Sequence, residues 1–297
     1  MKTAVIFGAG QVAQALVQAT APPGWTLRNV ARAMADITDA GAVAHAIEAG
    51  PSDAVINAAA YNDVEAAEDD VAAAFAVNRD GPGHIAAVCA ARDVALVHFS
   101  SDYVFGDAGA RAWCEDDTPA PINQYGASKL AGEEAVRAAT SRHVIIRTAW
   151  IYADRGDNFV ATMLALARTR DDICVVDDQI GNPTAAADIA GAVWKIVAGT
   201  GAAGDNFAFG TYHYAGAPVC SWYAHARAIF EVAAAQGLKV PRVRPITSAE
   251  YPLRAARPAN SSLDCSLIAR RLGIAQPDWR DALGTAIEAL AGGDVGQ

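Results

Sequence analysis

The sequence has few cysteines and no spacing that is typical of metal sites. Five of the 297 residues are cysteine, at positions 89, 114, 174, 220 and 265. They are dispersed and odd in number and form no C-x-x-C pair, which argues against structural zinc and against a disulfide framework. The six histidines show no metal-ligand spacing either. Isolated thiols suit a reducing compartment, so the sequence predicts a cytoplasmic protein.

Positive charge and long apolar runs are also scarce. The 23 lysines and arginines stand against 33 acidic residues, which gives a net charge of -10. This balance disfavours nucleic acid as a partner, because such binding needs a basic surface. No uninterrupted apolar run reaches membrane-spanning length, so no membrane partner is predicted. The acidic run 65–70 is expected to be a solvated helical face.

The chain does contain short apolar runs that alternate with alanine-rich helical stretches. Strands are expected at residues 3–7, 25–30, 53–57, 94–99 and 144–146, and helices at 72–91 and 128–139. This alternation predicts an α/β fold with a doubly wound, Rossmann-type parallel sheet. We expect residues 1–150 to form a dinucleotide-binding domain. Residues 151–297 are expected to form mainly a smaller substrate-binding lobe, with some later segments returning to the first domain.

A glycine-rich turn follows the first expected strand. The stretch Gly8-Ala9-Gly10-Gln11-Val12-Ala13 opens a helix and matches the pattern G-x-G-x-x-A. The first glycine permits a tight turn, and the second lets the backbone approach a pyrophosphate. The helix N-terminus adds unpaired N–H groups and a partial positive charge. We therefore predict that Gly8, Gly10, Gln11 and Val12 bind a dinucleotide; an ordinary strand-to-helix turn is the alternative.

The acidic residue that often binds the adenosine ribose is missing from its usual place. About 20 positions after such a turn, the sequence carries Arg28 and Arg32 and no acid. Either arginine is available for a 2′-phosphate, so the cofactor is predicted to be NADPH or NADH, with NADPH at least tolerated. Solvated surface arginines are the alternative. Asp36 and Ile37 come slightly later and are expected to flank the adenine.

Tyr125 and Lys129 are four residues apart, which places both on one face of an expected helix. A tyrosine titrates near ~10, and a neighbouring ammonium is expected to lower that pKa, so that the phenol acts as a general acid. Ser101 follows the strand upstream, where a parallel sheet binds ligands, and Ser100 is the competing hydroxyl. The small side chains of Ala58-Ala59-Ala60, after another strand, leave room for a flat cofactor.

Together these motifs resemble the extended short-chain dehydrogenase/reductases, and among them most closely the dTDP-4-dehydrorhamnose reductases. The matching stretches keep the family's order over nearly the whole chain: 57–61, 100–105, 125–133, 147–152, 158–159, 178–184 and 257–261. The resemblance implies NAD(P)H-dependent reduction of the 4-keto group of a nucleotide-linked 6-deoxyhexulose, as in dTDP-4-dehydrorhamnose to dTDP-L-rhamnose.

The resemblance also implies roles for residues near the reacting carbon. Ser101 takes the family's hydroxyl position and Tyr125 that of the proton donor. Lys129 takes the place of its partner, which also binds the nicotinamide ribose. Asn78 matches a family asparagine near the cofactor, with a helix-capping or backbone-bonding amide as the alternative.

On the substrate side, the resemblance implies that Asp102 and Trp150 line the sugar site and that Asn158 also binds substrate. Arg257 would face the diphosphate or the nucleotide, since a guanidinium engages phosphate oxygens in pairs. Some family members bind magnesium at a dimer interface through glutamates, but their positions here fall on alanines. We therefore predict no metal and leave a homodimer open.

Two other functions stay open at this point. One is a non-catalytic NADP-binding regulatory subunit, like that of methionine adenosyltransferase. The other is a nucleotide-sugar epimerase or dehydratase of the same superfamily. Ser101, Tyr125 and Lys129 favour an enzyme, because a pure binding module needs no proton donor. Trp150 and residues 257–261 favour a reductase.

Overall fold

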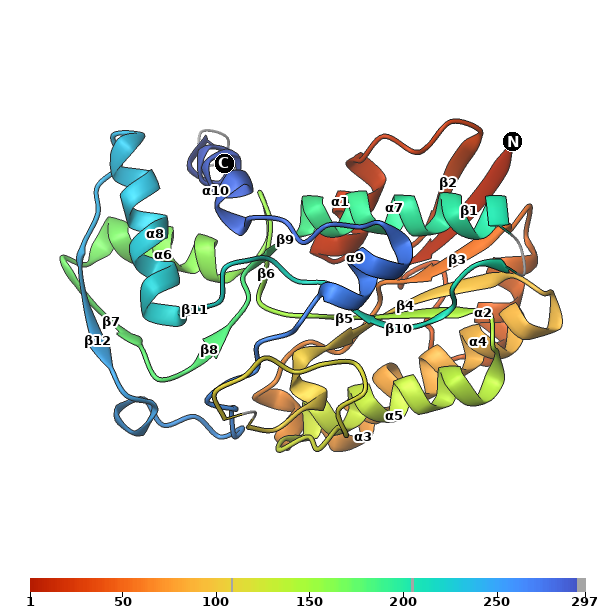
Figure 1. Cartoon of the computed structure of the whole chain (residues 1–297), viewed down its shortest axis with the longest axis horizontal. Helices are drawn as coiled ribbons and strands as arrows, with labels where there is room; N and C mark the ends of the chain where they lie inside the picture. The colour runs from red at the N-terminus through yellow and green to blue at the C-terminus, as the bar shows by residue number, and fades with distance from the viewer. Residues whose placement is uncertain (108, 204–205, 293–297) are drawn as a thin grey trace.

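A computed structural model describes residues 1–107, 109–203 and 206–292 of the chain (Figure 1). Within these ranges the centre is a six-stranded, all-parallel sheet in the order β10-β5-β4-β3-β1-β2. Its strands are β1 (Lys2–Phe7), β2 (Trp25–Val30), β3 (Ala54–Asn57), β4 (Ala95–Ser101), β5 (His143–Thr148) and β10 (Gly210–His213). The predicted α/β fold with a doubly wound parallel sheet is confirmed.

The sheet reverses its strand order beside β1. From β1 the chain adds β2 on one side, and then returns to add β3 on the other. Strand β4 is buried along its whole length, which explains why the strands appear in the sequence as continuous apolar runs. A reversal of this kind leaves a crevice beyond the carboxyl ends of the strands, where ligands bind in doubly wound folds.

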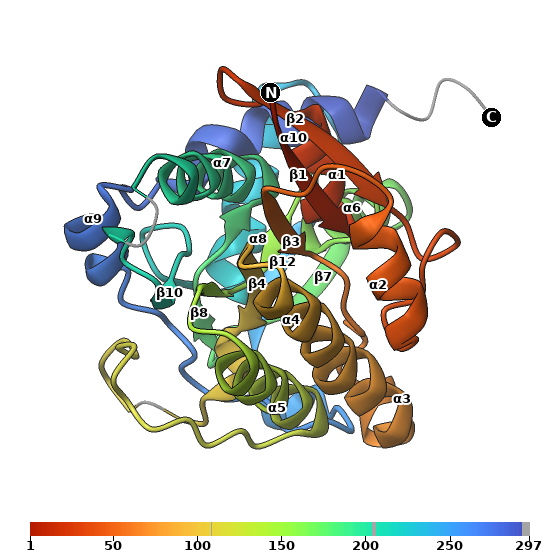
Figure 2. The same ribbon diagram turned by 90° about the vertical axis from the view of Figure 1, so that its right-hand side faces the viewer.

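Helices cover both faces of the sheet, as Figure 2 shows. One face carries α1 (Gln11–Gln18), packed against α7 (Ala186–Ala203). The other carries α2 (Ala40–Glu48), α4 (Gly81–Ala91) and α5 (Gln124–Ala139). Each face has its own cluster of buried apolar side chains. Helix α9 (Ser266–Leu272) contacts β10 at the edge of the sheet.

Two expected helices have different boundaries from those predicted. The stretch 72–91 contains α3 (Val71–Phe75) and α4, joined by the π-helical turn η2 (Ala76–Asp80). Helix α5 begins at Gln124, before the predicted start at residue 128, because Asn123 caps it. Two short 3₁₀ turns, η1 (Ala66–Glu68) and η3 (Asp102–Val104), follow the ends of β3 and β4.

A smaller lobe packs beside the sheet and has its own core. Its helices are α6 (Phe159–Thr169), α8 (Trp222–Ala235) and α10 (Trp279–Gly292). Its strand pairs are β7 (Asp172–Val176) with β12 (Arg242–Ile246), β6 (Ile151–Tyr152) with β9 (Thr184–Ala185), and β8 (Ile180–Gly181) with β11 (Cys220–Ser221). The 3₁₀ turn η5 (Ser248–Glu250) follows β12.

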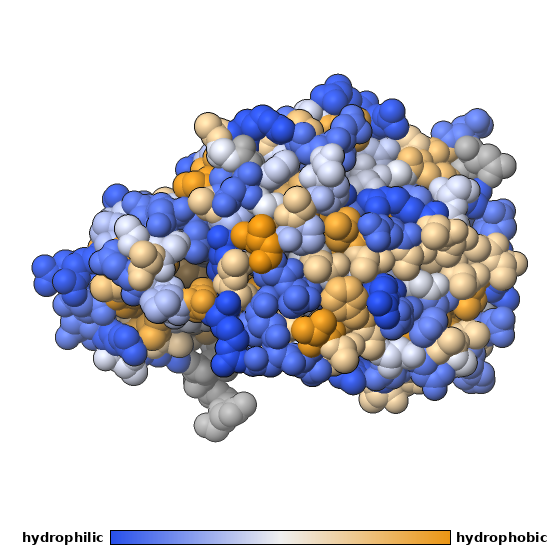
Figure 3. Space-filling model, turned by 90° about the horizontal axis from the view of Figure 1, so that it is seen from below, coloured by the Kyte–Doolittle hydropathy of each residue, from blue (hydrophilic) through white to orange (hydrophobic). Residues whose placement is uncertain are grey.

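The second half of the chain contributes both to the central sheet with its helices and to the smaller lobe. Helix α7 and strand β10 lie beyond residue 150 but belong to the sheet layer. The functional division at residue 150 stays a prediction. Among the described residues, no helix has the length and apolar character that a bilayer crossing requires. On the face seen from below in Figure 3, strongly apolar residues are scattered among polar ones.

Candidate active site

The glycine turn after β1 forms a bare helix N-terminus. Gly8 has a φ of +127°, and a Cβ there would lie 2.9 Å from the Ala58 carbonyl, so only glycine fits. Gly10 is the N-cap of α1 and supplies no side-chain hydrogen bond. A Cβ on Gly10 would meet no protein atom within 4 Å. The N-terminus of α1 therefore has no side-chain cap and is open at Gly10, and such a helix end can bind a phosphate group.

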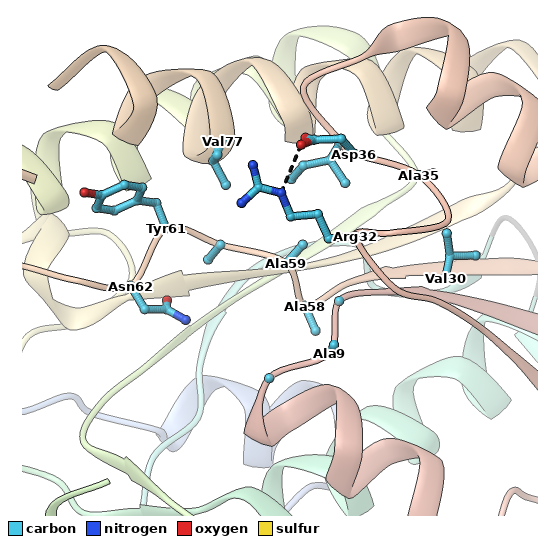
Figure 4. A pocket seen from close by; sticks show the side chains of 14 residues that line it. Ala9, Val30, Arg32, Ala35, Asp36, Ala58, Ala59, Tyr61, Asn62 and Val77 are labelled. Atoms are coloured by element: carbon cyan, nitrogen blue, oxygen red, sulfur yellow. Dashed lines mark hydrogen bonds and ion pairs between the residues drawn. The ribbon is translucent and has the colours of Figure 1, made fainter. Parts of the chain in front are cut away.

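A cleft beside this turn collects most of the predicted cofactor residues (Figure 4). It is lined by Gly8, Ala9, Gly10, Val30, Arg32, Ala35, Asp36, Ile37, Ala58, Ala59, Ala60, Tyr61, Asn62 and Val77. We call it the glycine-turn cleft. Its shape and its bare helix end fit the adenosine and pyrophosphate of a dinucleotide.

Arg32 is the cation of the glycine-turn cleft. Its Nε lies 3.0 Å from the Asp36 carboxylate (Figure 4). The Arg32 side chain is 82% exposed. The backbone and side chain of Thr38 bind the same carboxylate and are the main reason that the pKa of Asp36 is lowered. Arg28 has another role, because its guanidinium donates to the carbonyls of Ala46 and Ile47 at the end of α2. Of the two predicted arginines, only Arg32 is therefore placed for a 2′-phosphate.

A second cleft continues from the first and shares with it Ala58, Ala59, Ala60 and Asn62. We call it the catalytic cleft. Its other lining residues are Gln11, Val12, Val64, Phe99, Ser100, Ser101, Asp102, Tyr103, Tyr125, Lys129, Thr148, Ala149, Trp150, Ile151, Trp222 and Arg257. The structure thus brings together eight predicted residues from distant parts of the chain: Gln11, Val12, Ser101, Asp102, Tyr125, Lys129, Trp150 and Arg257.

Helix α5 carries Tyr125 and Lys129 into the catalytic cleft. Its N-terminus is held twice: the Asn123 side chain accepts from the N–H of Gly126 at 2.7 Å, and Glu68 accepts from the N–H of Gln124 at 2.8 Å. Gly126 lies against η3, and a Cβ there would clash with the Tyr103 carbonyl. The glycine that follows Tyr125 therefore lets the helix start directly beside the end of β4.

Burial dominates the electrostatics of the Tyr125 and Lys129 pair. The Lys129 ammonium donates to the Phe99 carbonyl at 2.7 Å. Burial lowers the pKa of Lys129 to about 8, and the nearby Glu133 carboxylate opposes this shift. Desolvation raises the pKa of Tyr125, and a hydrogen bond with Ser101 opposes the rise. The predicted net lowering of the Tyr125 pKa is therefore wrong in this structure, because desolvation outweighs the groups that favour the phenolate.

The geometry distinguishes the two candidate hydroxyls at the end of β4. Ser101 donates to the Asp102 carboxylate at 2.9 Å, accepts from the Tyr103 N–H at 3.1 Å, and acts directly on Tyr125. Ser100 lies beside Glu133 and lowers the pKa of that carboxyl. Ser101 is therefore the hydroxyl beside the phenol. Its partner Asp102 is buried, and burial raises the pKa of that carboxyl to about 6.

Two stacked indoles form the wall of the catalytic cleft nearest the smaller lobe. Trp150 and Trp222 lie 3.5 Å apart between ring centroids, with an interplanar angle of 8°. Trp150 has a φ of +42°, and a Cβ on Gly181 would overlap its ring. The sequence pointed to Trp150 but missed Trp222. The only local signal is its position as the first residue of α8, behind the capping Ser221.

Arg257 lies at the rim of the catalytic cleft with two protein partners. Its guanidinium donates to Glu65 at 2.9 Å and to the Tyr103 hydroxyl at 3.0 Å. The prediction of a solvated acidic face at 65–70 is therefore wrong for Glu65, and equally for Glu68, which binds the start of α5. Sequence reasoning missed both contacts because the partners are far away along the chain.

Two predicted site residues, Asn158 and Asn78, line neither cleft among the described residues. Asn158 caps α6 through a 3.0 Å bond from the Ala161 N–H and donates to the Gln11 side chain at 3.3 Å. Buried Asn78 binds the backbone of Tyr61 through 2.9 and 3.0 Å bonds and donates to Ser128 at 2.9 Å. The alternative of a backbone-bonding amide describes the contacts of Asn78. Both residues hold segments that form the clefts.

Comparisons with known proteins agree with this geometry. A family model described as RmlD substrate binding domain matches residues 1–291. The chain is 40% identical over 290 residues to a dTDP-4-dehydrorhamnose reductase from Sinorhizobium fredii, with 98% of each chain covered. It is similar to the crystal structure of a dTDP-4-dehydrorhamnose reductase from Clostridium acetobutylicum, with 31% identity, a TM-score of 0.89, and 97% of this chain and 99% of that chain covered. The corresponding enzyme from Bacillus anthracis, solved in complex with NADP, matches with 33% identity, a TM-score of 0.88 and the same coverage.

Proposed function

The chain belongs to the RmlD substrate binding domain family, and from this premise we propose that it reduces the 4-keto group of dTDP-4-dehydrorhamnose to give dTDP-L-rhamnose, with NADPH or NADH as the reductant. One observation carries the proposal: Tyr125, Lys129 and Ser101 converge on a cleft that continues into the glycine-turn cleft. A keto reductase needs a proton donor beside the site where a dinucleotide ends, and this arrangement supplies one.

The glycine-turn cleft has the groups that such a dinucleotide needs. The N-terminus of α1 at Gly10 would hold the pyrophosphate, Arg32 would face a 2′-phosphate, and Lys129 would bind the nicotinamide ribose. The bound cofactor supplies hydride to the substrate carbon. The small side chains of Ala58-Ala59-Ala60 leave space between the two clefts.

Tyr125 would provide the proton that balances the hydride. A tyrosine ordinarily titrates near ~10, and desolvation raises the pKa of Tyr125 further, so the phenol is protonated at neutral pH and holds a proton to give. That proton passes to the carbonyl oxygen while the carbon accepts hydride, so the ketone becomes a secondary alcohol. Ser101 binds the phenol and can orient the same oxygen. Lys129, one helical turn away, would stabilise the phenolate that remains.

The substrate would lie between the pair Tyr125 and Lys129, the catalytic dyad, and the smaller lobe. The stacked pair Trp150 and Trp222 offers an apolar wall for a sugar or a base, and Asp102 offers a polar group beside Ser101. Arg257 would take the diphosphate. Location in the cytoplasm is proposed on the five free thiols. A homodimer stays a prediction that light scattering of the purified protein tests.

The direct test is turnover of the purified protein with dTDP-4-dehydrorhamnose and each nicotinamide cofactor. We expect stoichiometric cofactor oxidation and formation of dTDP-rhamnose. Cofactor binding without turnover on several nucleotide-4-ketosugars would instead favour the regulatory-subunit function. Protein that purifies with tightly bound NAD⁺ and causes no net oxidation would favour an epimerase or dehydratase.

A further inference from the structure

A short segment of the chain, residues 254–257, ends at the catalytic cleft, which Arg257 lines. We call it the strap. It comes from the stretch after β12 and runs back toward α3 and α5 (Figure 1). The Asn123 side chain, which also caps α5, donates to the carbonyl of Ala256 at 2.9 Å. The strap is thus attached to the first turn of the helix that carries Tyr125.

Glu65 holds the strap with both of its carboxylate oxygens. One oxygen accepts from the Arg257 guanidinium at 2.9 Å. The other accepts from the backbone N–H groups of Arg254 and Ala255 at 2.8 and 3.3 Å. Burial alone would raise the pKa of Glu65, but these three bonds outweigh it and lower the pKa. The carboxylate is therefore ionised when it holds the strap.

Arg257 has further N–H groups besides those that bind Glu65 and Tyr103. A guanidinium has five N–H groups. One of them binds Glu65 and another binds the Tyr103 hydroxyl at 3.0 Å. Each of its two terminal nitrogens therefore keeps one further N–H, and Arg257 lines the catalytic cleft. An anion in the cleft can accept from these donors in a charge-assisted hydrogen bond.

We propose that Glu65 is a positioning residue that determines specificity for the diphosphate of the substrate, because it fixes the strap and the Arg257 guanidinium at the rim of the catalytic cleft. The proposal rests on the proposed function, since a nucleoside diphosphate sugar supplies the anion. Glu65 has a cost of its own: its negative charge repels a phosphate. The arrangement favours binding only if orienting Arg257 outweighs that repulsion, and removal of Glu65 measures which effect is larger.

The test compares Glu65→Gln and Glu65→Ala with a matched control. Glu65→Ala should raise the KM for the nucleotide sugar by about tenfold or more, because charge-assisted bonds to Arg257 and the strap are lost. We expect kcat to stay within about twofold, since the dyad is untouched. Glu65→Gln should show a smaller rise, because its amide oxygen still accepts. The affinity for NADPH should not change in either variant.

Asp63→Asn serves as the control. The substitution removes a negative charge from the same segment of the chain, and Asp63 lines neither cleft. The Asp63 carboxylate accepts from the Ala66 N–H at 2.9 Å, and the amide oxygen of asparagine can accept the same bond. We therefore expect the KM of this variant to stay within about twofold of the wild type. Thermal melting of all three variants shows whether each is folded.

A second readout separates this proposal from the proposed function. Calorimetry should show that the wild type prefers dTDP to thymidine and that Glu65→Ala loses about tenfold of that preference. An unchanged or lower KM in the Glu65 variants, or an equal loss of affinity for dTDP and thymidine, would overturn the role of Glu65. If the wild type fails to turn over dTDP-4-dehydrorhamnose, the proposed function is wrong, while the dTDP-to-thymidine ratio still tests Glu65.

Discussion

The phenol of Tyr125 is partly withdrawn from water, and its raised pKa keeps it protonated near neutrality. Replacement by phenylalanine removes that proton and leaves the ring in place. We expect Tyr125→Phe to lower kcat by about 10²–10⁴-fold, with unchanged NADPH affinity in a fluorescence titration. Tyr251→Phe is the control, because this side chain is 56% exposed and lies outside both clefts. If Tyr125→Phe kept most of its turnover, another group would have to donate the proton.

Lys129 gives the reaction a predictable dependence on pH. The ammonium is the form that stabilises a phenolate, and its pKa is lowered by burial to about 8. Because the ammonium loses its proton as the pH rises through this value, kcat/KM should fall above a pH of about 8. Lys129→Arg, where active, should lack this alkaline limb, since a guanidinium keeps its charge. A flat wild-type profile from neutral to strongly alkaline pH would contradict this assignment.

At this scale, residues were predictable from the sequence where they belong to local motifs. Tyr125 and Lys129 are one helical turn apart, so spacing alone placed them together. Spacing left Ser100 and Ser101, at the end of β4, as alternatives, and the family resemblance favoured Ser101. Trp222 and Glu65 were missed, because each acts through a partner distant in the sequence. The shifted pKa of Tyr125 was also unpredictable, since burial is a property of the packed cleft.

The strand–turn–helix element of β1 and α1 offers a matched pair of glycine substitutions. Gly8→Ala would place a Cβ against the Ala58 backbone at a φ of +127°, whereas a Cβ at Gly10 meets nothing within 4 Å. We expect Gly8→Ala to lose at least about 1–3 kcal/mol of stability. Gly10→Ala should melt like the wild type but bind NADPH less tightly, because the added methyl group points where the pyrophosphate would lie.

Urea unfolding and NADPH titration of the two variants check this prediction. We expect the two effects to separate: Gly8→Ala should lose stability, and Gly10→Ala should lose affinity for NADPH. If Gly10→Ala bound NADPH as tightly as the wild type, the bare end of α1 would not be the phosphate site. If Gly8→Ala were fully stable, the turn would not depend on its left-handed backbone.

The elements themselves were predictable to different degrees. Strands β1, β3, β4 and β5 were found as apolar runs, because strands buried in a parallel sheet carry little polar alternation. Strand β2, at the edge of the sheet, is partly exposed and carries polar residues. The π-helical turn inside 72–91 was not predicted, because alanine-rich sequence favours a continuous helix. Its backbone meets α5 where a Cβ on Gly132 would clash with the Asn78 carbonyl, so a tertiary contact explains what local propensity could not.

At the scale of the whole molecule, the sequence predicted the sheet domain better than the smaller lobe. Alternating strands and helices fix the topology of the first half, since parallel strands require crossovers. The return of α7 and β10 to the sheet depends on pairing between β10 and β5, more than sixty residues apart. The strand pairs of the smaller lobe are mostly two residues long, too short to leave a sequence pattern.

The sheet domain and the smaller lobe meet at the glycine turn after β1. Binding of the cofactor at this turn should therefore raise the thermal stability of the whole molecule. The Gln11 side chain donates to the carbonyl of Asp157 at 2.8 Å, so the turn contacts the smaller lobe directly. A ligand at one hundred times its Kd stabilises a protein by about 2.7 kcal/mol. For a chain of this size each kcal/mol corresponds to a rise in Tm of about 2–4 °C.

NADPH should therefore raise the Tm by several degrees, and by more than NADH at equal concentration, because Arg32 can pair only with a 2′-phosphate. Arg32→Ala should lower the shift caused by NADPH to that caused by NADH and leave the NADH shift unchanged. Arg28→Ala is not a suitable control, since Arg28 holds the end of α2; the exposed Arg79→Ala is better. Equal Tm shifts for NADPH and NADH in the wild type would mean that Arg32 does not bind the 2′-phosphate. The exposed Arg32–Asp36 pair would then only fasten the loop after β2.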